Sequence, residues 1–80
     1  MKETKIKLDT VVDAKEFVTE AMKCKFDIDI FYNHVVVDAK SILGVLSLDL
    51  TKVLTVRTHG ENETFDSYLS GVSASAGLTA

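Results

Sequence analysis

Hydrophobic and polar residues alternate along three stretches of the chain, which is typical of half-buried β-strands. The alternation covers residues 4–9, 27–32 and 53–58. A β-branched run at residues 35–37 follows the second stretch after only Asn33 and His34. We therefore predict four strands, with the middle two joined as a β-hairpin by a two-residue turn.

Apolar residues recur at helical spacing in two further segments. The first segment predicts a helix over residues 13–24, with Asp13 as its N-cap and Glu16 three residues later, as in a capping box. A last helix is predicted after Asn62, a good N-cap. The apolar stripe of this helix comprises Phe65, Leu69, Val72 and Ala76. Gly77 and Leu78 are predicted to end it.

The apolar run over residues 42–48 follows Ser41, which is a strong N-cap residue. Periodicity alone leaves a short helix and a buried strand open for this run. The predicted order is β-α-β-β-(α)-β-α, which favours an α+β fold with helices on one face of a four-stranded antiparallel sheet. We expect residues 1–80 to form a single domain, because the chain has only 80 residues.

Composition and charge exclude several classes of function. The net charge is −3, and the sequence has no run of Lys or Arg that could bind a phosphate backbone or an anionic membrane. With 46% hydrophobic residues and a mean hydropathy of +0.16, an exposed apolar patch is plausible for so small a domain. We expect no nucleic-acid partner, no membrane partner and no small-molecule substrate, since a deep pocket is hard to build in such a chain.

The thiol and imidazole content argues against disulfides, metals and cofactors. One cysteine, Cys24, cannot form an intramolecular disulfide, and this indicates a reducing, cytoplasmic setting. Together with His34 and His59 it supplies too few ligands for a structural zinc site, so we expect no metal. The N-terminus has no apolar stretch typical of a signal peptide, and the longest mostly apolar segment, 42–50, is too short to span a bilayer.

The central segment carries a family resemblance. It reads Lys25-Phe26-Asp27, then Tyr32-Asn33, then Asp38-Ala39-Lys40-Ser41-Ile42-Leu43-Gly44-Val45-Leu46-Ser47-Leu48. These residues resemble HPr, the histidine phosphocarrier of the bacterial phosphoenolpyruvate–sugar phosphotransferase system. The resemblance implies an HPr-like open-faced β-sandwich, a helix over 42–48 capped by Ser41, and a protein that is not an enzyme.

The same resemblance exposes a departure at the first helix. HPr carries its phosphoryl group on a histidine in a His-Ala-Arg-Pro motif, whereas this chain reads Val11-Val12-Asp13-Ala14-Lys15-Glu16. An ungapped count puts Val12 at the histidine's place, and a one-residue shift puts Asp13 there and Lys15 at the arginine's. A phosphocarrier needs a neutral imidazole nitrogen as nucleophile. We therefore expect a degenerate phosphocarrier site at Val12, Asp13 and Lys15, with no catalytic residue.

The resemblance also implies where partners and regulation would act. In many HPr proteins the serine equivalent to Ser41 is phosphorylated by a dedicated kinase, and neighbouring apolar residues bind partners. We therefore expect regulatory phosphorylation at Ser41. We expect HPr kinase, enzyme I or regulator-like proteins to bind at Lys40, Ile42, Leu43 and Leu46.

Alternative interpretations stay open for these residues and for the protein as a whole. Ser41 is also explained as an N-cap alone, and the apolar residues after it as core. His34 and His59, or Asp13 as an acyl-phosphate acceptor, would suit an active phosphocarrier with a non-standard acceptor. An unrelated protein-interaction domain on the same topology is a third hypothesis.

Overall fold

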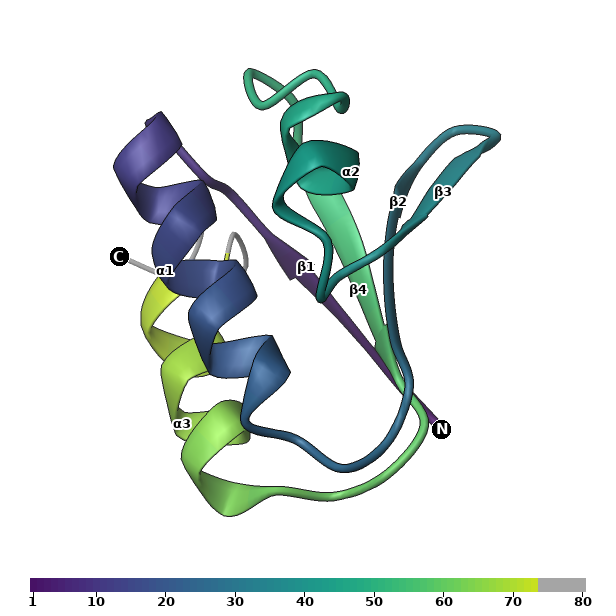
Figure 1. Ribbon diagram of the computed structural model, residues 1–80, viewed down its shortest axis with the longest axis vertical. Coiled ribbons are helices and arrows are strands. Elements are labelled where there is room, and N and C mark those ends of the chain that lie inside the picture. Colours follow the sequence, from purple (N-terminus) through teal and green to yellow (C-terminus); the bar gives the residue numbers. More distant parts are fainter. Residues whose placement is uncertain (74–80) are drawn as a thin grey trace.

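Strands and helices follow one another in the predicted order, and the α+β class is confirmed (Figure 1). The computed structural model describes residues 1–73. The elements are β1 (Lys2–Ile6), α1 (Val11–Met22), β2 (Ile28–Tyr32), β3 (Val35–Asp38), α2 (Ile42–Leu46), β4 (Leu54–Thr58) and α3 (Glu63–Val72).

The four strands form one antiparallel sheet in the order β1-β4-β2-β3. β4 lies inside the sheet, where Leu54 is opposite Ile6 on β1 and Val56 is opposite Ile30 on β2. The helices cover one face of this sheet, and the other face is left open (Figure 1). Period-2 alternation fits this arrangement, because the buried residues of each strand face the helices.

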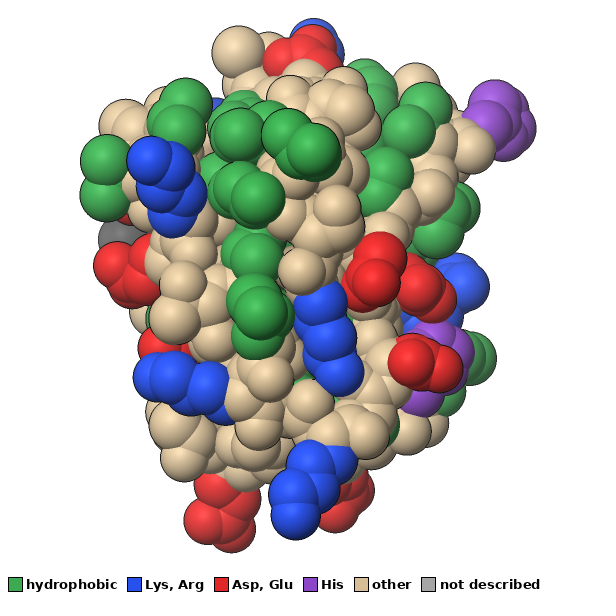
Figure 2. All heavy atoms as spheres, in the orientation of Figure 1, with side chains coloured by type: hydrophobic (Ala, Val, Ile, Leu, Met, Phe, Trp, Pro, Cys, Tyr) green, Lys and Arg blue, Asp and Glu red, His purple; other side chains and the backbone are tan. Residues whose placement is uncertain are grey.

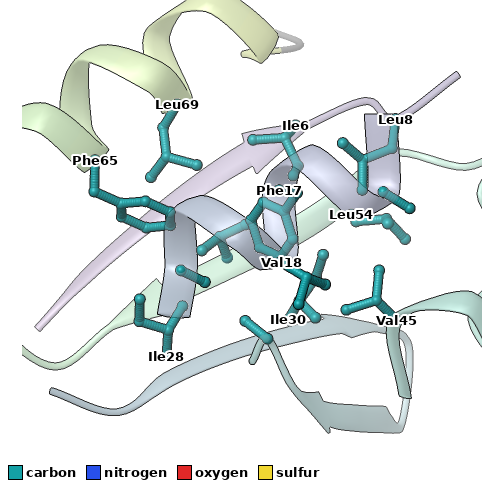
Figure 3. Packing of buried hydrophobic residues seen from close by; sticks show 14 of the residues in the cluster. Ile6, Leu8, Phe17, Val18, Ile28, Ile30, Val45, Leu54, Phe65 and Leu69 are labelled. Atoms are coloured by element: carbon teal, nitrogen blue, oxygen red, sulfur yellow. The ribbon is translucent and has the colours of Figure 1, made fainter. Parts of the chain in front are cut away.

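A single hydrophobic core fills the space between the sheet and the helices (Figure 3). Phe17 of α1 lies at its centre and Phe65 of α3 lies beside it, with ring centroids 6.2 Å apart. The largest fully buried side chains are Phe17, Phe65, Ile6, Leu8, Ile28, Ile30, Leu54, Leu69, Val45 and Val56. Helices α1 and α3 are thereby fixed on the sheet, and their polar faces are left for solvent.

The predicted hairpin between β2 and β3 is confirmed. Tyr32 pairs directly with Val35, so Asn33 and His34 form the whole turn. Asn33 has a φ of 53°, which the short Asn side chain tolerates better than most residues do.

Helix α1 begins two residues earlier than predicted, and its N-cap is Thr10 rather than Asp13. The Thr10 Oγ1 accepts a hydrogen bond from the Asp13 N–H at 3.1 Å. Asp13 lies within the first turn, where its carboxylate accepts from the Asp9 N–H at 3.2 Å. The two side chains thus hold the helix start together, much as in a capping box.

Several other boundaries differ from the sequence-based prediction by one to three residues, among them the ends of β1 and α2. β1 ends at Ile6, because that residue is paired with Leu54, the first residue of its partner β4. Leu8 is nevertheless fully buried, as the alternation predicted. Helix α2 ends at Leu46, where the Ser47 N–H bonds back to the Leu43 and Gly44 carbonyls.

The end of the last helix was predicted from Ala76, Gly77 and Leu78, which lie outside the described residues. Its start agrees with the prediction, because Asn62 caps α3 by accepting from the Phe65 N–H at 3.0 Å.

Candidate functional site

The start of α1 is occupied by the chain's own oxygen atoms. Thr10 and Asp13 accept the hydrogen bonds described above, and the Thr10 carbonyl accepts from the Ala14 N–H at 3.1 Å. Val12 is 70% exposed but has no atom that could accept a phosphoryl group. The predicted residues Val12 and Asp13 therefore lie together at this helix start, without a nitrogen nucleophile among them.

Both imidazoles of the sequence lie elsewhere in the fold. His34 occupies the tip of the β2–β3 hairpin, and His59 follows the end of β4. The His59 Nε2 lies 3.1 Å from the Asp29 Oδ2, so its neighbour is an anion. The nearby Arg57 guanidinium is bound to the Glu3 carboxylate at 2.8 Å. Neither histidine stands at a helix start beside a cation, which is the arrangement that stabilises a phosphoryl group.

Helix α2 presents a serine hydroxyl and an exposed apolar residue. The Ser41 Oγ accepts from the Gly44 N–H at 3.2 Å, which confirms Ser41 as the N-cap. Val45 is fully buried and anchors the helix on the core, whereas Leu43 is 80% exposed and Leu46 is partly exposed. The helix therefore divides its apolar residues between the core and the surface.

Lys40 does not reach toward the Ser41 hydroxyl. Its ammonium donates instead to the Cys24 carbonyl at 3.0 Å, just beyond the end of α1. No basic residue lies in the last turn of α1, so Lys40 supplies the positive charge that suits a helix C-terminus. The Cys24 thiol is buried there, and burial raises its pKa, which disfavours the reactive thiolate form.

A shallow hollow of about 350 Å³ lies between α1 and α2, lined by Lys15, Val18, Thr19 and Ile42. It brings together two predicted residues from separate groups, Lys15 of the degenerate phosphocarrier site and Ile42 of the expected partner surface. Val18 and Thr19 were not predicted as site residues, and only the helical spacing from Lys15 could have indicated them.

Hydrophobic side chains gather over this part of the molecule, across the start of α1, α2 and the β2–β3 hairpin (Figure 2). The exposed large residues of these elements on the helix side of the sheet are Val11, Val12, Leu43, Leu46 and Val35, whereas Val36 points to the open face. Single exposed apolar residues are normal, and a group of them on one side is the kind of feature that protein-binding surfaces share. An open, shallow surface of this kind suits a protein partner better than an enclosed small molecule.

Within residues 1–73, no group of three or more His, Cys, Asp and Glu side chains is arranged to hold a metal ion. The helices in this described part are also too short or too polar to cross a membrane.

Comparison with known proteins identifies the scaffold. Residues 11–67 match the family described as the PTS HPr component phosphorylation site. A crystal structure of HPr-C-His from Thermoanaerobacter tengcongensis is similar, with 28% sequence identity over 89% of both chains and a TM-score of 0.74. A phosphocarrier protein HPr from Bacillus anthracis has 26% identity over 88% of this chain and 93% of its own, with a TM-score of 0.69. Comparison with curated protein sequences gives no significant match.

Proposed function

Because the chain belongs to the HPr component family of the phosphotransferase system, we propose that it is a regulatory or accessory member that binds partner proteins through α2. It does so without relaying phosphoryl groups through a histidine. The observation that carries this proposal is the pairing of an exposed apolar α2 with an α1 start that holds no imidazole.

The chemistry at α1 supports the loss of phosphotransfer. Transfer of a phosphoryl group to a protein requires a nucleophile that attacks the phosphorus and hydrogen-bond donors directed at the phosphoryl oxygens. At this helix start the side chains are Val12 and the carboxylate Asp13, and Asp13 repels a phosphate. Lys15, the remaining cation of this site, lies in the hollow beside Ile42.

The exposed hydroxyl of Ser41 supports regulation by a kinase. A phosphate on this N-cap would stand at the start of α2, where helix N–H groups favour negative charge. It would also add about −1.5 to −2 charges beside Leu43, in the middle of the proposed binding surface. Phosphorylation would thereby change which partners α2 accepts.

The first test is phosphorylation by phosphoenolpyruvate and enzyme I. We expect the protein to stay unlabelled, while a histidine-containing HPr in the same reaction is labelled. Acid-labile label that disappears in His34→Ala or His59→Ala would contradict the proposal and establish a working phosphocarrier with a displaced acceptor.

The second test uses ATP and HPr kinase. We expect one phosphate on the parent protein and none on Ser41→Ala. Ser47→Ala is the matched control, because Ser47 is also exposed and stands at the other end of the same helix. Equal labelling of the parent and Ser41→Ala would show that the Ser41 hydroxyl is not the acceptor.

The third test concerns binding by α2 itself. Leu43→Ser should leave the free energy of unfolding within about 0.5 kcal/mol of the parent, because the side chain is 80% exposed. It should nevertheless reduce the NMR chemical-shift changes that occur when enzyme I is titrated into the isotope-labelled protein. Undiminished binding by this variant would move the partner surface away from α2.

A further inference from the structure

Strand β3 forms the more open of the two edges of the sheet. At the opposite edge, Ser73 forms a bridge with Ile6, and the Lys7 N–H donates to the Val72 carbonyl at 3.1 Å. These contacts partly cover β1. Among residues 1–73, no strand pairs with the outer side of β3, which stands at the end of the order β1-β4-β2-β3 (Figure 1).

The register of the hairpin fixes which backbone groups point outward from β3. Tyr32 pairs with Val35 across the two-residue turn, and the Ala39 N–H donates to the Ile28 carbonyl. The backbone N–H and C=O groups alternate in direction along an antiparallel strand. Those of Val35 and Val37 therefore point toward β2. The N–H and C=O of Val36 and the N–H of Asp38 therefore point away from the sheet.

Two of the usual protections of an edge strand, Lys and Pro, are absent from β3, which is protected by its length of four residues and by Asp38. Edge strands commonly carry Lys or Pro, which discourage pairing with another chain. β3 reads Val35-Val36-Val37-Asp38, and its first two residues are 52% and 57% exposed. A short apolar edge with outward N–H and C=O groups is a template for a further strand.

We propose that this edge pairs with β3 of a second copy of the same chain, antiparallel, with the two-fold axis at Val36. In this register the outward groups of Val36 meet those of Val36 in the second copy. His34 stands opposite Asp38 of the second copy, and Asp38 stands opposite its His34. The same surface thus complements itself, as a two-fold interface requires.

Side chains on the open face of the sheet support the same register. Phe31 and Val36 are opposite one another within the hairpin, so the pairing extends an apolar row from one copy into the next. Asp29 is opposite Asp38, and two carboxylates facing each other repel. An imidazole N–H beside Asp38 would give that carboxylate a second donor, in addition to the Lys40 N–H, from which it accepts at 2.9 Å. A register shifted by two residues would place His34 opposite Val36 and lose these pairs.

The interface is small, since only about five residues of each copy take part. Stable protein interfaces bury about 1,200–2,000 Å², so this dimer is weak and depends on protein concentration. It leaves α2 as a separate surface, and the inference does not depend on the proposed function.

The test is a concentration series of the full chain, followed by sedimentation velocity and by amide shifts in NMR spectra. We expect the average mass to rise with concentration, with the Val36 and Asp38 amide signals shifting most. A chain that stays monomeric throughout, or shifts that map to β1 or α2, would overturn the proposal.

Val36→Pro tests the edge directly. Because the Val36 N–H points outward, proline removes no hydrogen bond of the monomer but blocks the central pair of the dimer. We expect a folded monomer at every concentration, whereas Leu43→Ser, which removes an exposed apolar residue from α2, should dimerise like the parent. Persistent dimerisation of Val36→Pro would refute the pairing.

A charge exchange tests the register and does not rely on proline. His34→Glu, in an exposed turn, should weaken the dimer about tenfold, because repulsion between the introduced carboxylate of one copy and Asp38 of the other would replace two favourable cross-strand pairs. The double variant His34→Glu with Asp38→Lys should restore it. If His34→Glu dimerises as the parent does, then the Val36-centred register is wrong.

Discussion

A single threonine determines where α1 begins. Thr10 and Asp13 are both good capping residues, and the pattern Thr10-x-x-Asp13 resembles the same capping signature as Asp13-x-x-Glu16. The sequence-based prediction chose the second pattern and placed the helix start too late. The hydrogen bond from the Asp13 N–H to the Thr10 Oγ1 decides between them.

Substitution of Thr10 measures this cap. Thr10→Ala should lower the free energy of unfolding by about 1 kcal/mol, because one N–H at the helix start loses its acceptor. Thr10→Ser keeps the hydroxyl and should stay close to the parent. Urea denaturation followed by circular dichroism makes the comparison, and equal stability of all three proteins would argue against Thr10 as the cap.

Tyr68 gives the protein a titration at alkaline pH. Its hydroxyl is half-buried, and burial raises its pKa above the usual value of 10, with the carboxylates Glu16, Asp13 and Glu20 acting in the same direction. The folded state therefore favours the neutral form of the phenol more than the unfolded state does.

The sign of the effect on stability follows from this difference. Below pH 10 the phenol is neutral in both states, and its contribution to the free energy of unfolding is fully present. As the pH rises above 10 the unfolded state ionises first, so stability falls. Denaturation between pH 9 and 11 should show a steeper loss for the parent than for Tyr68→Phe. Parallel pH profiles for the two proteins would show that the phenol does not contribute.

At the scale of elements, local patterns predicted the type of every helix and strand except α2, but not all of their ends. The hairpin was predicted correctly because alternation and a two-residue turn act over a few neighbouring residues. β1 was extended too far because its end depends on where β4, distant in the sequence, begins. The assignment of residues 42–48 to a helix needed the family resemblance, since their periodicity was ambiguous.

The candidate site was predicted less completely than the fold. Ser41 caps α2, as a serine before an apolar run predicts, but the sequence did not indicate that Leu43 would be the most exposed apolar residue of this helix. The hydrogen bond from the Lys40 ammonium to the Cys24 carbonyl was not predicted, because the two residues lie 16 positions apart in the sequence. The hollow that joins Lys15 to Ile42 forms only when α1 and α2 pack together, and a linear pattern carries no sign of that packing.

The connection between β4 and α3 depends on Gly60. A Cβ at this position would overlap the Phe26 ring and would also lie 3.0 Å from the Phe26 Cβ, so rotation of the ring alone would not relieve the clash. Gly60→Ala should therefore lower the free energy of unfolding by about 1–3 kcal/mol. The double variant with Phe26→Ala should lose less than the sum of the two single changes. Strict additivity in chemical denaturation would contradict this contact.

The whole molecule relies on one hydrophobic cluster. Phe17 is fully buried and contacts the ring systems of Phe65 and Tyr68, with centroids 6.2 and 6.4 Å away. Phe17→Ala should cost about 3–5 kcal/mol. Domains of this size have only about 5–15 kcal/mol of stability in total, so much of it should be lost. Thermal unfolding by calorimetry tests this, and a melting temperature unchanged from the parent would mean that Phe17 is not central.

The strand order has a consequence for synthesis on the ribosome. The first strand pairs with the last, and Lys2 and Thr58 are partners although they are 56 residues apart. A nascent chain that has not yet released β4 can form the hairpin and α1, but it has nothing to join β1 to β2. Such non-local pairing delays folding until nearly the whole chain is available. Ribosome-bound chains ending before residue 54 should therefore remain open to proteases.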